Sequence, residues 1–570
     1  MIPFCYRRYT TMAARKSFPT KKYKSTNDLS KLKVISLPSH SPPEDFRQMH
    51  LMPVVSDLLS TEDATNSPFL RPNSTKKPYS DVDTYLETHL RLLWADFIQP
   101  LRETIGTFCK GTQQVPPVDG KPNQRIHFYR NVQFVKNSFL SSTTVPDRPD
   151  SWRRYSIQFD SLPGFDWEKS KRLIYGSLVC LWNAPYRLRI LATITQSDPE
   201  ELEKGWLTVS IEHPPENVPD FTQITYTMLE CEVFYEPYRV VMEVYRQLQE
   251  DSFPFKEHLL GWRKDPGVPT YLTTKSYRHN YRVTTTSGTI VTVKDVLNIS
   301  TWPSAVDLGV NPIQRTALHA AMTRRLALIQ GPPGTGKTFI GRKIISTLLD
   351  NKHLWHDGGN YVQDNARLFA KFTAGKMHKF WEANGSLWRD QRCPIVVICL
   401  TNQALDQFME GVLKSTKKVI RIGSQSQSSL LEGYLMSVYK DNIEQERKNY
   451  KESAYLYHCY QRNGMKKVIQ DTVDDIQCLT KKLRNQKMEK SRNRVAERET
   501  LSKLGALEDI YKSQIVKYNQ IKDEMDASLC RSVDVIGLTT TGAARRRNVL
   551  TVLQPKIGTN FLFKFCFVWR

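Results

Sequence analysis

The sequence predicts an α/β protein: a parallel-sheet domain with a phosphate-binding loop (P-loop), a β-rich, barrel-like accessory domain, and a helical insertion within the sheet domain. Three observations lead to this prediction. After residue 300, apolar strands alternate with helices. Short β-rich runs fill residues 121–300, and a charged, mostly helical stretch spans about 439–529. The 570 residues exceed the roughly 300 that one core holds, so several domains are expected.

The N-terminal residues 1–43 are basic and rich in Ser, Thr and Pro. Such a composition lacks the apolar surface that offsets the entropy of ordering, so we expect a disordered basic arm. A mitochondrial transit segment is the alternative, because residues 1–27 hold seven Lys or Arg and no acid.

Residues 44–120 are expected to form a helical lead-in. Its main helix spans about 81–101, because five apolar residues recur at helical spacing after a Ser80-x-x-Asp83 start. These are Leu86, Leu90, Leu93, Phe97 and Leu101.

Residues 121–300 predict an antiparallel barrel or small sheet, since apolar β-type runs are separated by Pro, Asn, Asp and Gly. The expected strands are 172–181, 187–194, 206–213 and a pair within 281–293, with a helix at about 237–249.

Residues 301–570 predict the first P-loop domain, a parallel sheet covered on both faces. Two insertions interrupt it, at about 351–392 and about 439–529. The second mixes both signs of charge, which indicates a solvated helical hairpin; an RNA-binding arm is the alternative. The expected strands are 326–330, 395–400, 419–423 and 533–539.

Charge and cysteine usage narrow the function. The net charge of +23 favours a polyanionic partner, nucleic acid above all, because basic groups release counterions from phosphates; scattered surface lysines are the alternative. The ten cysteines form no C-x-x-C pair or zinc-type cluster, so we expect no metal centre from them and reduced thiols. No stretch reaches about 20 apolar residues, so no membrane insertion is expected.

The motif GPPGTGKT carries the predicted chemistry, because it matches G-x-x-x-x-G-K-[ST] between an apolar strand and a plausible helix. Glycines let backbone amides surround phosphate oxygens, and the helix N-terminus adds a favourable dipole. Lys337 is expected to neutralise the β and γ phosphates, and Thr338 to offer its hydroxyl to Mg²⁺. The nucleotide-binding residues are Gly331, Pro332, Pro333, Gly334, Thr335, Gly336, Lys337 and Thr338.

The residues before the P-loop resemble the start of the motor of superfamily 1B RNA helicases, whose first domain is RecA-like. In that family a glutamine at about this distance reads the adenine of ATP, and here it is Gln314. An amide suits adenine because it donates and accepts hydrogen bonds. A P-loop kinase or GTPase is not supported, because no guanine-reading N-K-x-D string occurs.

Two later segments resemble RNA-contacting motifs of the same superfamily. In 394 PIVVICLTNQALDQFMEGV 412, Thr401 and Asn402 would contact phosphate or ribose. In 534 DVIGLTTTGAARRR 547, Thr539, Thr540 and Thr541 would do so, with Arg545 to Arg547 supplying positive charge.

Within the superfamily, residues 40–557 are most similar to NFX-type zinc-finger-containing helicases. The similarity includes 42 PPEDFRQMHLMPVVSDLL 59, 84 TYLETHLRLLWADFIQPLRE 103 and 167 WEKSKRLIYGSLVCL 181. The resemblance implies an ATP-dependent RNA helicase in small-RNA silencing or antiviral RNA defence, with small-RNA silencing or RNA-dependent RNA polymerase complexes as partners. It implies a location in cytoplasm or nucleus, including RNA granules.

The C-terminal segment departs from the family pattern. An acidic Walker B strand is expected after residue 557, but the sequence reads 558 GTNFLFKFCFVWR 570, and Asp534 is the last acidic residue. We therefore expect a truncated or misjoined product that does not hydrolyse ATP, because phosphoryl transfer needs a carboxylate near the metal. A catalytically inactive RNA-binding or scaffold protein is the alternative function. The alternating aromatic residues of this tail predict a strand with an exposed edge.

Overall fold

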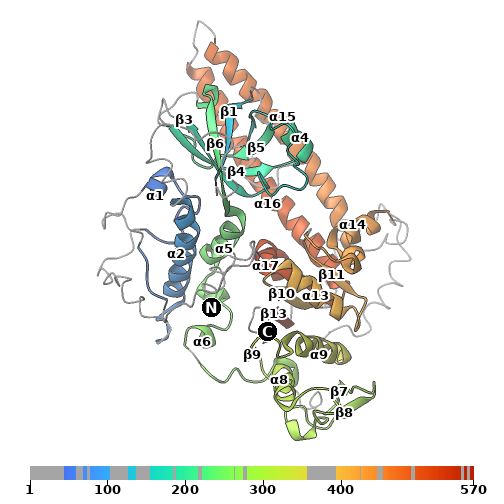
Figure 1. Ribbon diagram of the computed structural model, residues 1–570. Coiled ribbons are helices and arrows are strands. Elements are labelled where there is room, and N and C mark those ends of the chain that lie inside the picture. Colours follow the sequence, from blue (N-terminus) through green and yellow to red (C-terminus); the bar gives the residue numbers. More distant parts are fainter. Residues whose placement is uncertain are drawn as a thin grey trace, which may run out of the picture. The chain divides into compact units, whose positions relative to one another are not determined.

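The computed structural model describes two compact units, separated between Arg263 and Lys264 (Figure 1). The described residues are 44–59, 69–73, 77–102, 126–135, 154–183, 188–215, 221–261, 263–273, 279–355, 393–423, 425–445, 454–488, 494–553, 557–561 and 565–569. The expected N-terminal arm, 1–43, and most of the first expected insertion, 351–392, lie outside them.

The first unit is built around a closed six-stranded barrel with the order β1-β2-β5-β4-β3-β6. All six pairings are antiparallel, and alternate apolar side chains such as Ile157, Val179 and Val209 fill the interior. The expected antiparallel barrel is therefore present, although its third strand begins at Ser177 and not at 172, since Leu173 and Gly176 have positive φ. The strands are β1 Ile126–Phe134, β2 Arg154–Gln158, β3 Ser177–Asn183, β4 Leu188–Gln196, β5 Trp206–Ser210 and β6 Tyr226–Phe234.

Helices cover the outside of this barrel. The lead-in helix α2, Val82–Leu101, buries Leu86, Leu90 and Phe97, which have no exposed surface, against a cluster that includes α5 residues. Its N-cap is Asp81, whose carboxylate accepts from Thr84 N at 2.6 Å, so the start expected at Ser80 lies one residue too early. The helices of this unit are α1 Val55–Leu59, α2, α4 Pro199–Glu203, α5 Tyr235–Gln247 and α6 Lys256–Leu259.

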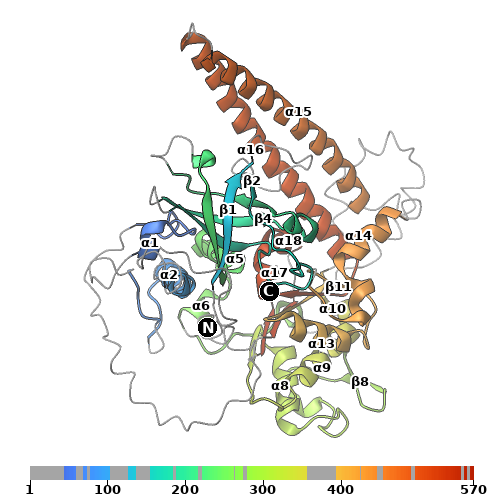
Figure 2. The same cartoon turned by 45° about the horizontal axis from the view of Figure 1, so that its top comes forward.

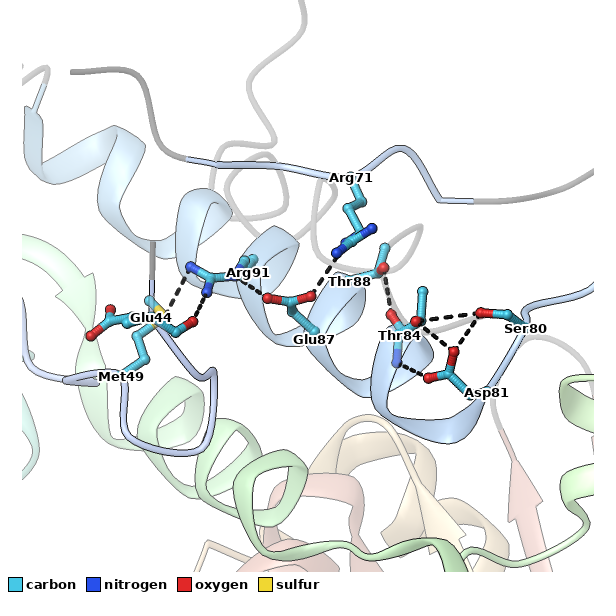
Figure 3. Close-up of polar contacts among 9 residues, drawn as sticks. All are labelled: Glu44, Met49, Arg71, Ser80, Asp81, Thr84, Glu87, Thr88 and Arg91. Carbon is cyan, nitrogen blue, oxygen red and sulfur yellow. Dashed lines mark hydrogen bonds and ion pairs between the residues drawn. The ribbon is translucent and has the colours of Figure 1, made fainter. Parts of the chain in front are cut away.

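A buried charged network fixes the lead-in on α2 (Figure 3). Glu87 accepts from Arg91 Nε at 3.0 Å and from Arg71 Nε at 3.2 Å. Arg91 also donates to the carbonyl oxygen of Glu44 at 2.8 Å. Because buried charges are tolerated only when paired, this network ties residues near 44 and 71 to one face of α2.

The second unit begins earlier than the boundary expected at 300/301. The hairpin β7 Tyr281–Thr284 and β8 Ile290–Val293 contributes Tyr281, Val283 and Val293 to the core that also holds the helix after the P-loop. Asn351, at the end of that helix, accepts from Arg282 N at 2.7 Å and donates to Arg282 O at 2.6 Å. The strand pair was expected in the accessory domain, but it packs against the P-loop domain.

The sheet of the second unit has six strands in the order β11-β12-β10-β13-β14-β9. Strands β11, β12, β10 and β13 are parallel, while β14 runs antiparallel to both of its neighbours, β13 and β9. The sheet is thus mixed and not purely parallel, and the tail expected to leave an exposed edge is paired on both sides. The strands are β9 Leu326–Ile329, β10 Ile395–Cys399, β11 Val419–Arg421, β12 Val535–Thr539, β13 Ile557–Phe561 and β14 Phe565–Trp569.

This topology brings five strand ends to one edge. Since β14 is antiparallel to both β13 and β9, β9 runs in the same direction as β13, β10, β12 and β11. Their carboxyl ends therefore lie at the same edge, where ligands bind in open α/β sheets. The helices of this unit are α8 Pro312–Thr323, α9 Lys337–Asp350, α10 Lys352–Trp355, α13 Asn402–Val412, α14 Met436–Gln445, α15 Ala454–Met488, α16 Arg494–Arg531, α17 Thr540–Arg545 and α18 Arg547–Leu553.

The expected helical insertion is the antiparallel pair α15 and α16, which projects from the sheet domain (Figure 2). Buried side chains line the seam between the two helices, including Ile469, Ile476, Tyr511 and Ile515. At the base, Met525, Leu529 and Cys530 join Ile420 and Ile536 of the sheet in one cluster. No helix in the described parts of either unit is long and apolar enough to cross a bilayer.

Candidate functional site

The P-loop joins β9 to α9 at the common strand edge. Lys337 is the first residue of α9, and its ammonium donates to the carbonyl oxygens of Gly331 at 2.8 Å and Pro332 at 2.7 Å. An ammonium has three donors, so one remains beyond these two contacts. Residues 332–335 and Thr338 are exposed. The loop is therefore open to an incoming phosphate.

Glycine is favoured at Gly336 by its backbone conformation. Its φ of +80° lies in the left-handed region, and a Cβ atom there would also displace the end of the Gln314 side chain. Gly336 is also the N-cap of α9 and provides no side-chain acceptor. The first amides of α9 are consequently left for an anion, which also benefits from the helix dipole.

Gln314 connects α8 to the P-loop. It occupies the third position of α8 in a capping box: its Oε1 accepts from Asn311 N at 3.1 Å, and its own N–H donates to Asn311 Oδ1 at 2.7 Å. Its Nε2 donates to Thr335 O at 3.1 Å. One amide hydrogen and one lone pair remain, the pair of groups that the edge of adenine requires.

These residues fit a magnesium-bound nucleoside triphosphate. The donors available for phosphate are one hydrogen of Lys337 and the first amides of α9, and the exposed hydroxyl of Thr338 is an oxygen ligand of the kind Mg²⁺ binds. No group of three His, Cys, Asp or Glu side chains that could hold a metal occurs in the described parts of the chain. A metal at this loop would thus rely on phosphate oxygens and Thr338.

Strand β13, which is two strands from β9, carries the residues 557 IGTNF 561 and has no carboxylate.

At the end of β10, the neighbour of β13, burial raises the pKa of Cys399 to about 12, with the carboxylate of Asp406 adding to the shift. The thiol therefore stays protonated at neutral pH, which excludes it as a nucleophile.

The first predicted RNA-contacting pair lies at the end of β10. Thr401 caps α13 by accepting from Ala404 N at 3.1 Å, so its hydroxyl is held at the helix start. Asn402 Oδ1 accepts from Arg421 Nη2 at 2.6 Å, and Asn402 Nδ2 approaches Gln425 Oε1 at 3.4 Å. One hydrogen of the Asn402 amide remains for an external acceptor.

Arg421 orients Asn402, and sequence reasoning missed it. Its guanidinium is fully buried and donates to Asp406 Oδ1 at 3.2 Å as well as to Asn402. Asp406 Oδ2 in turn accepts from Ser426 Oγ and Gln427 N, each at 3.0 Å. The signal was a single arginine within the apolar run 419 VIRIG 423, because a charge inside a buried strand must find a partner.

The second predicted RNA-contacting motif, Thr539 to Thr541, lies next to the first. Thr539 ends β12 and caps α17 by accepting from Gly542 N at 3.1 Å. Cys399 and Thr539 are register partners on the parallel strands β10 and β12. The residues that follow, Thr401 on one strand end and Thr540 on the other, therefore start adjacent helices at the same edge.

The arginines after this motif do not all extend to solvent. Arg546 forms an ion pair with Asp526, a fully buried acid near the end of α16 that Lys440 also contacts at 2.5 Å. Arg545 is exposed and Arg547 is partly buried. Of the three arginines expected to supply positive charge to RNA, Arg546 is therefore paired within the protein, where it holds the base of the hairpin.

The P-loop and the two threonine motifs are separated by a small number of strands. β9 lies three strand spacings from β10, which at about 4.8 Å each is roughly 14 Å. A nucleotide on the P-loop and a strand on the threonine motifs would thus occupy neighbouring parts of one edge.

Comparisons with known proteins agree with this arrangement. The ZNFX1 domain family matches residues 121–232, which include most of the barrel, and an AAA domain family matches residues 309–552, which include the P-loop and both threonine motifs. The second match confirms the expected α/β P-loop fold.

Three relatives illustrate the similarity. The NFX1-type zinc finger-containing protein 1 of Homo sapiens is 30% identical over 71% of this chain and 20% of its own length. The Helicase required for RNAi-mediated heterochromatin assembly 1 of Schizosaccharomyces pombe is 25% identical over 68% of this chain and 33% of its own length. The Caenorhabditis elegans homologue of the human protein is 22% identical over 68% of this chain and 18% of its own length.

The chain thus spans about a fifth of the length of the NFX1-type relatives. Over that part it joins a ZNFX1 domain to a helicase-type P-loop AAA domain, as the P-loop, its glutamine and the two threonine motifs predicted. The chain carries a ZNFX1 domain and a helicase-type AAA domain, and its homologues include NFX1-type zinc finger-containing proteins.

Proposed function

We propose that this chain is the ATP- and RNA-binding N-terminal part of an RNA helicase motor. The observation that carries the proposal is the common strand edge: the P-loop follows β9, while the threonine motifs follow β10 and β12 in register. Beside the P-loop, this edge presents the start of α13 and the remaining amide hydrogen of Asn402 to a phosphate backbone.

Different residues of this chain bind the different parts of the two ligands. Lys337 and the first amides of α9 hold the phosphates, and Gln314 holds the adenine while it is tied to Thr335. Thr338 would offer its hydroxyl to a magnesium ion, which would supply positive charge beside the phosphate oxygens. Asn402, Thr401 and Thr539 to Thr541 contact the RNA backbone, which gives affinity without sequence preference.

The Gln314–Thr335 bond also suggests how the sites communicate. A phosphate that accepts the remaining hydrogen of Lys337 pulls on an ammonium that also contacts Gly331 O and Pro332 O, which shifts the loop that Gln314 holds. Since β9 and β10 belong to one sheet, a shift of the loop alters the edge on which RNA lies. ATP and RNA are then coupled ligands, and each changes the affinity for the other.

A second candidate function is a catalytically inactive, nucleotide-gated RNA-binding or scaffold protein. It is favoured by strand β13, whose residues 557–561 include no Asp or Glu, so that this strand supplies no acid beside β10. RNA-stimulated phosphate release by this chain distinguishes the two: release supports the hydrolysing motor, and ATP binding without release supports the second function.

The cellular role follows from relatives. One relative is named as a helicase required for RNAi-mediated heterochromatin assembly, so we propose a role in small-RNA silencing or antiviral RNA defence. The partners would be RNA and silencing or RNA-dependent RNA polymerase complexes, in cytoplasm, nucleus or RNA granules.

The RNA site is tested by Asn402→Asp. This change keeps an oxygen for Arg421 but replaces the outward amide hydrogens by negative charge. We expect affinity for a short single-stranded RNA of about eight nucleotides to fall about tenfold, because a phosphate loses a donor and meets a like charge. Fluorescence anisotropy measures this.

The control is Gln520→Glu, which makes the same amide-to-acid change at an exposed residue of α16. Its short-RNA affinity should stay within about twofold of the unaltered chain. If the two variants bind the short RNA equally well, the strand edge does not bind RNA and the proposal fails.

A further inference from the structure

The charge of the helical hairpin is unevenly distributed along its length. Residues 454–480 and 504–531 together hold seven Lys or Arg and eight Asp or Glu, which nearly balance. Residues 481–503, at the far end, hold nine Lys or Arg and only three Glu. A hairpin that was merely kept soluble would carry mixed charges throughout, as its lower part does.

The basic residues at this end are available to a partner. Five of them have exposed side chains, and we call this set the basic tip: Lys481, Lys482, Arg494, Arg498 and Lys503. The two helices meet here, since Thr500 Oγ1 donates to Gln486 Oε1 at 3.1 Å. The basic tip is therefore one surface contributed by both helices.

The two acids that the structure describes at this end do little to neutralise the surface. Glu497 is buried. Glu499 accepts from Lys503 at 2.7 Å, and this bond, with a smaller effect of Lys482, lowers its pKa. Exposed ion pairs of this kind contribute little energy and separate readily. The exposed Lys and Arg side chains therefore give this surface a net positive charge.

We propose that the basic tip is a second RNA-binding site that holds the phosphate backbone. The proposal rests on the proposed function, because it takes the ligand of the strand edge to be RNA. Residues 481–503 contain no Phe, Tyr or Trp, so the surface has no platform for stacking bases. Its recognition is consequently electrostatic, independent of sequence and strongly dependent on salt.

The length of the hairpin determines which RNAs reach both sites. The 35 residues of α15 extend about 50 Å at 1.5 Å per residue. A stacked nucleic acid strand rises about 3.4 Å per nucleotide, so this length corresponds to roughly 15 stacked nucleotides. A short RNA therefore binds the strand edge alone, whereas a long RNA contacts the strand edge and the basic tip together and gains affinity from the linkage.

The test compares two variants of the full chain with four alanines each. The tip variant changes Lys481, Lys482, Arg494 and Arg498. The control variant changes four exposed lysines of the balanced part of the same helices, namely Lys466, Lys467, Lys512 and Lys517. All eight side chains are exposed, so neither variant loses buried contacts, and circular dichroism verifies the helix content.

Anisotropy with single-stranded RNAs of about 8 and about 40 nucleotides at several salt concentrations gives the readout. We expect the tip variant to bind the long RNA at least about tenfold more weakly, with a log–log salt slope smaller by about 3, since four phosphate contacts at about 0.7 each are lost. Its short-RNA affinity should change less than about twofold. The control variant should change less than about twofold with both RNAs.

Equal long-RNA affinities of the tip and control variants would overturn the proposal and would leave the basic tip as a surface for an acidic protein. The Asn402→Asp variant separates this failure from that of the proposed function. If the tip variant loses long-RNA affinity while Asn402→Asp binds normally, the tip site stands and the strand-edge site fails. The reverse pattern supports the strand edge alone and overturns the tip site.

Discussion

Replacing Lys337 by alanine is expected to weaken ATP binding by about 30-fold or more. The ammonium is the cation of the P-loop, and its contacts with Gly331 O and Pro332 O hold it across the mouth of the loop, where the phosphates would lie. Charge-assisted hydrogen bonds are worth about 1.5–3 kcal/mol each, so losing even one phosphate contact costs about 2 kcal/mol. Titration calorimetry with ATP and Mg²⁺ measures the change.

The matched control is Lys417→Ala. Lys417 is exposed and lies just before β11, at the amino edge of the same sheet. It therefore carries the same charge as Lys337 but lies away from the P-loop. We expect this variant to bind ATP like the unaltered chain. Equal losses in both variants would indicate a diffuse charge effect and would contradict a specific phosphate site.

Arg421→Ala is expected to reduce the free energy of unfolding of the sheet domain by about 3–5 kcal/mol. The change leaves the buried carboxylate of Asp406 without its ion-pair partner and removes the donors to the carbonyl oxygens of Ile422 and Gln425. Removing one member of a buried ion pair costs this much because the remaining charge stays out of water. Denaturant unfolding followed by circular dichroism gives the value.

Two comparisons refine this result. Arg324→Ala removes an arginine that is 54% exposed at the side chain and should cost less than about 0.5 kcal/mol. Arg421→Lys keeps the charge but loses the planar fork that reaches Asp406 and Asn402 together, so it should be intermediate in stability and still weaken RNA binding. A loss below about 1 kcal/mol for Arg421→Ala would show that the network does not hold the strand end.

The parts of the fold that the sequence predicted well are those with local signals. The P-loop strand and helix, α2 and the strand β12 all follow from periodicity, glycine spacing or a capping residue. Pairings that depend on distant residues were harder to predict. The hairpin β7 and β8 has ordinary strand signals, and its packing in the core around α9 and its bonds to Asn351 show that it belongs to the P-loop domain.

The same distinction applies to the site. Gln314, Lys337, Thr401 and Thr539 could be found because each occupies a recognisable place in a motif. Their interactions could not be foreseen: the bond from Gln314 to Thr335 spans 21 residues, and the bond from Arg421 to Asn402 spans 19. The ion pair of Arg546 with Asp526 likewise needs the base of α16 beside α17, which composition does not reveal.

The β14 strand shows a different limit. An alternating apolar pattern predicts a strand but does not say which neighbours it pairs with. Here Phe565–Trp569 runs between β13 and β9, so both of its edges are occupied. The expectation of an exposed edge failed because register and strand order are properties of the whole sheet.

Nucleotide at the P-loop and RNA at the strand ends are expected to bind to one coupled edge of the sheet. The direct test is the affinity of the full chain for the eight-nucleotide RNA, with and without Mg²⁺ and a non-hydrolysable ATP analogue. We predict a change of at least about fivefold, the lower range of typical coupling energies, and no change in Lys337→Ala. Identical RNA affinities of the unaltered chain with and without the nucleotide would contradict the claim.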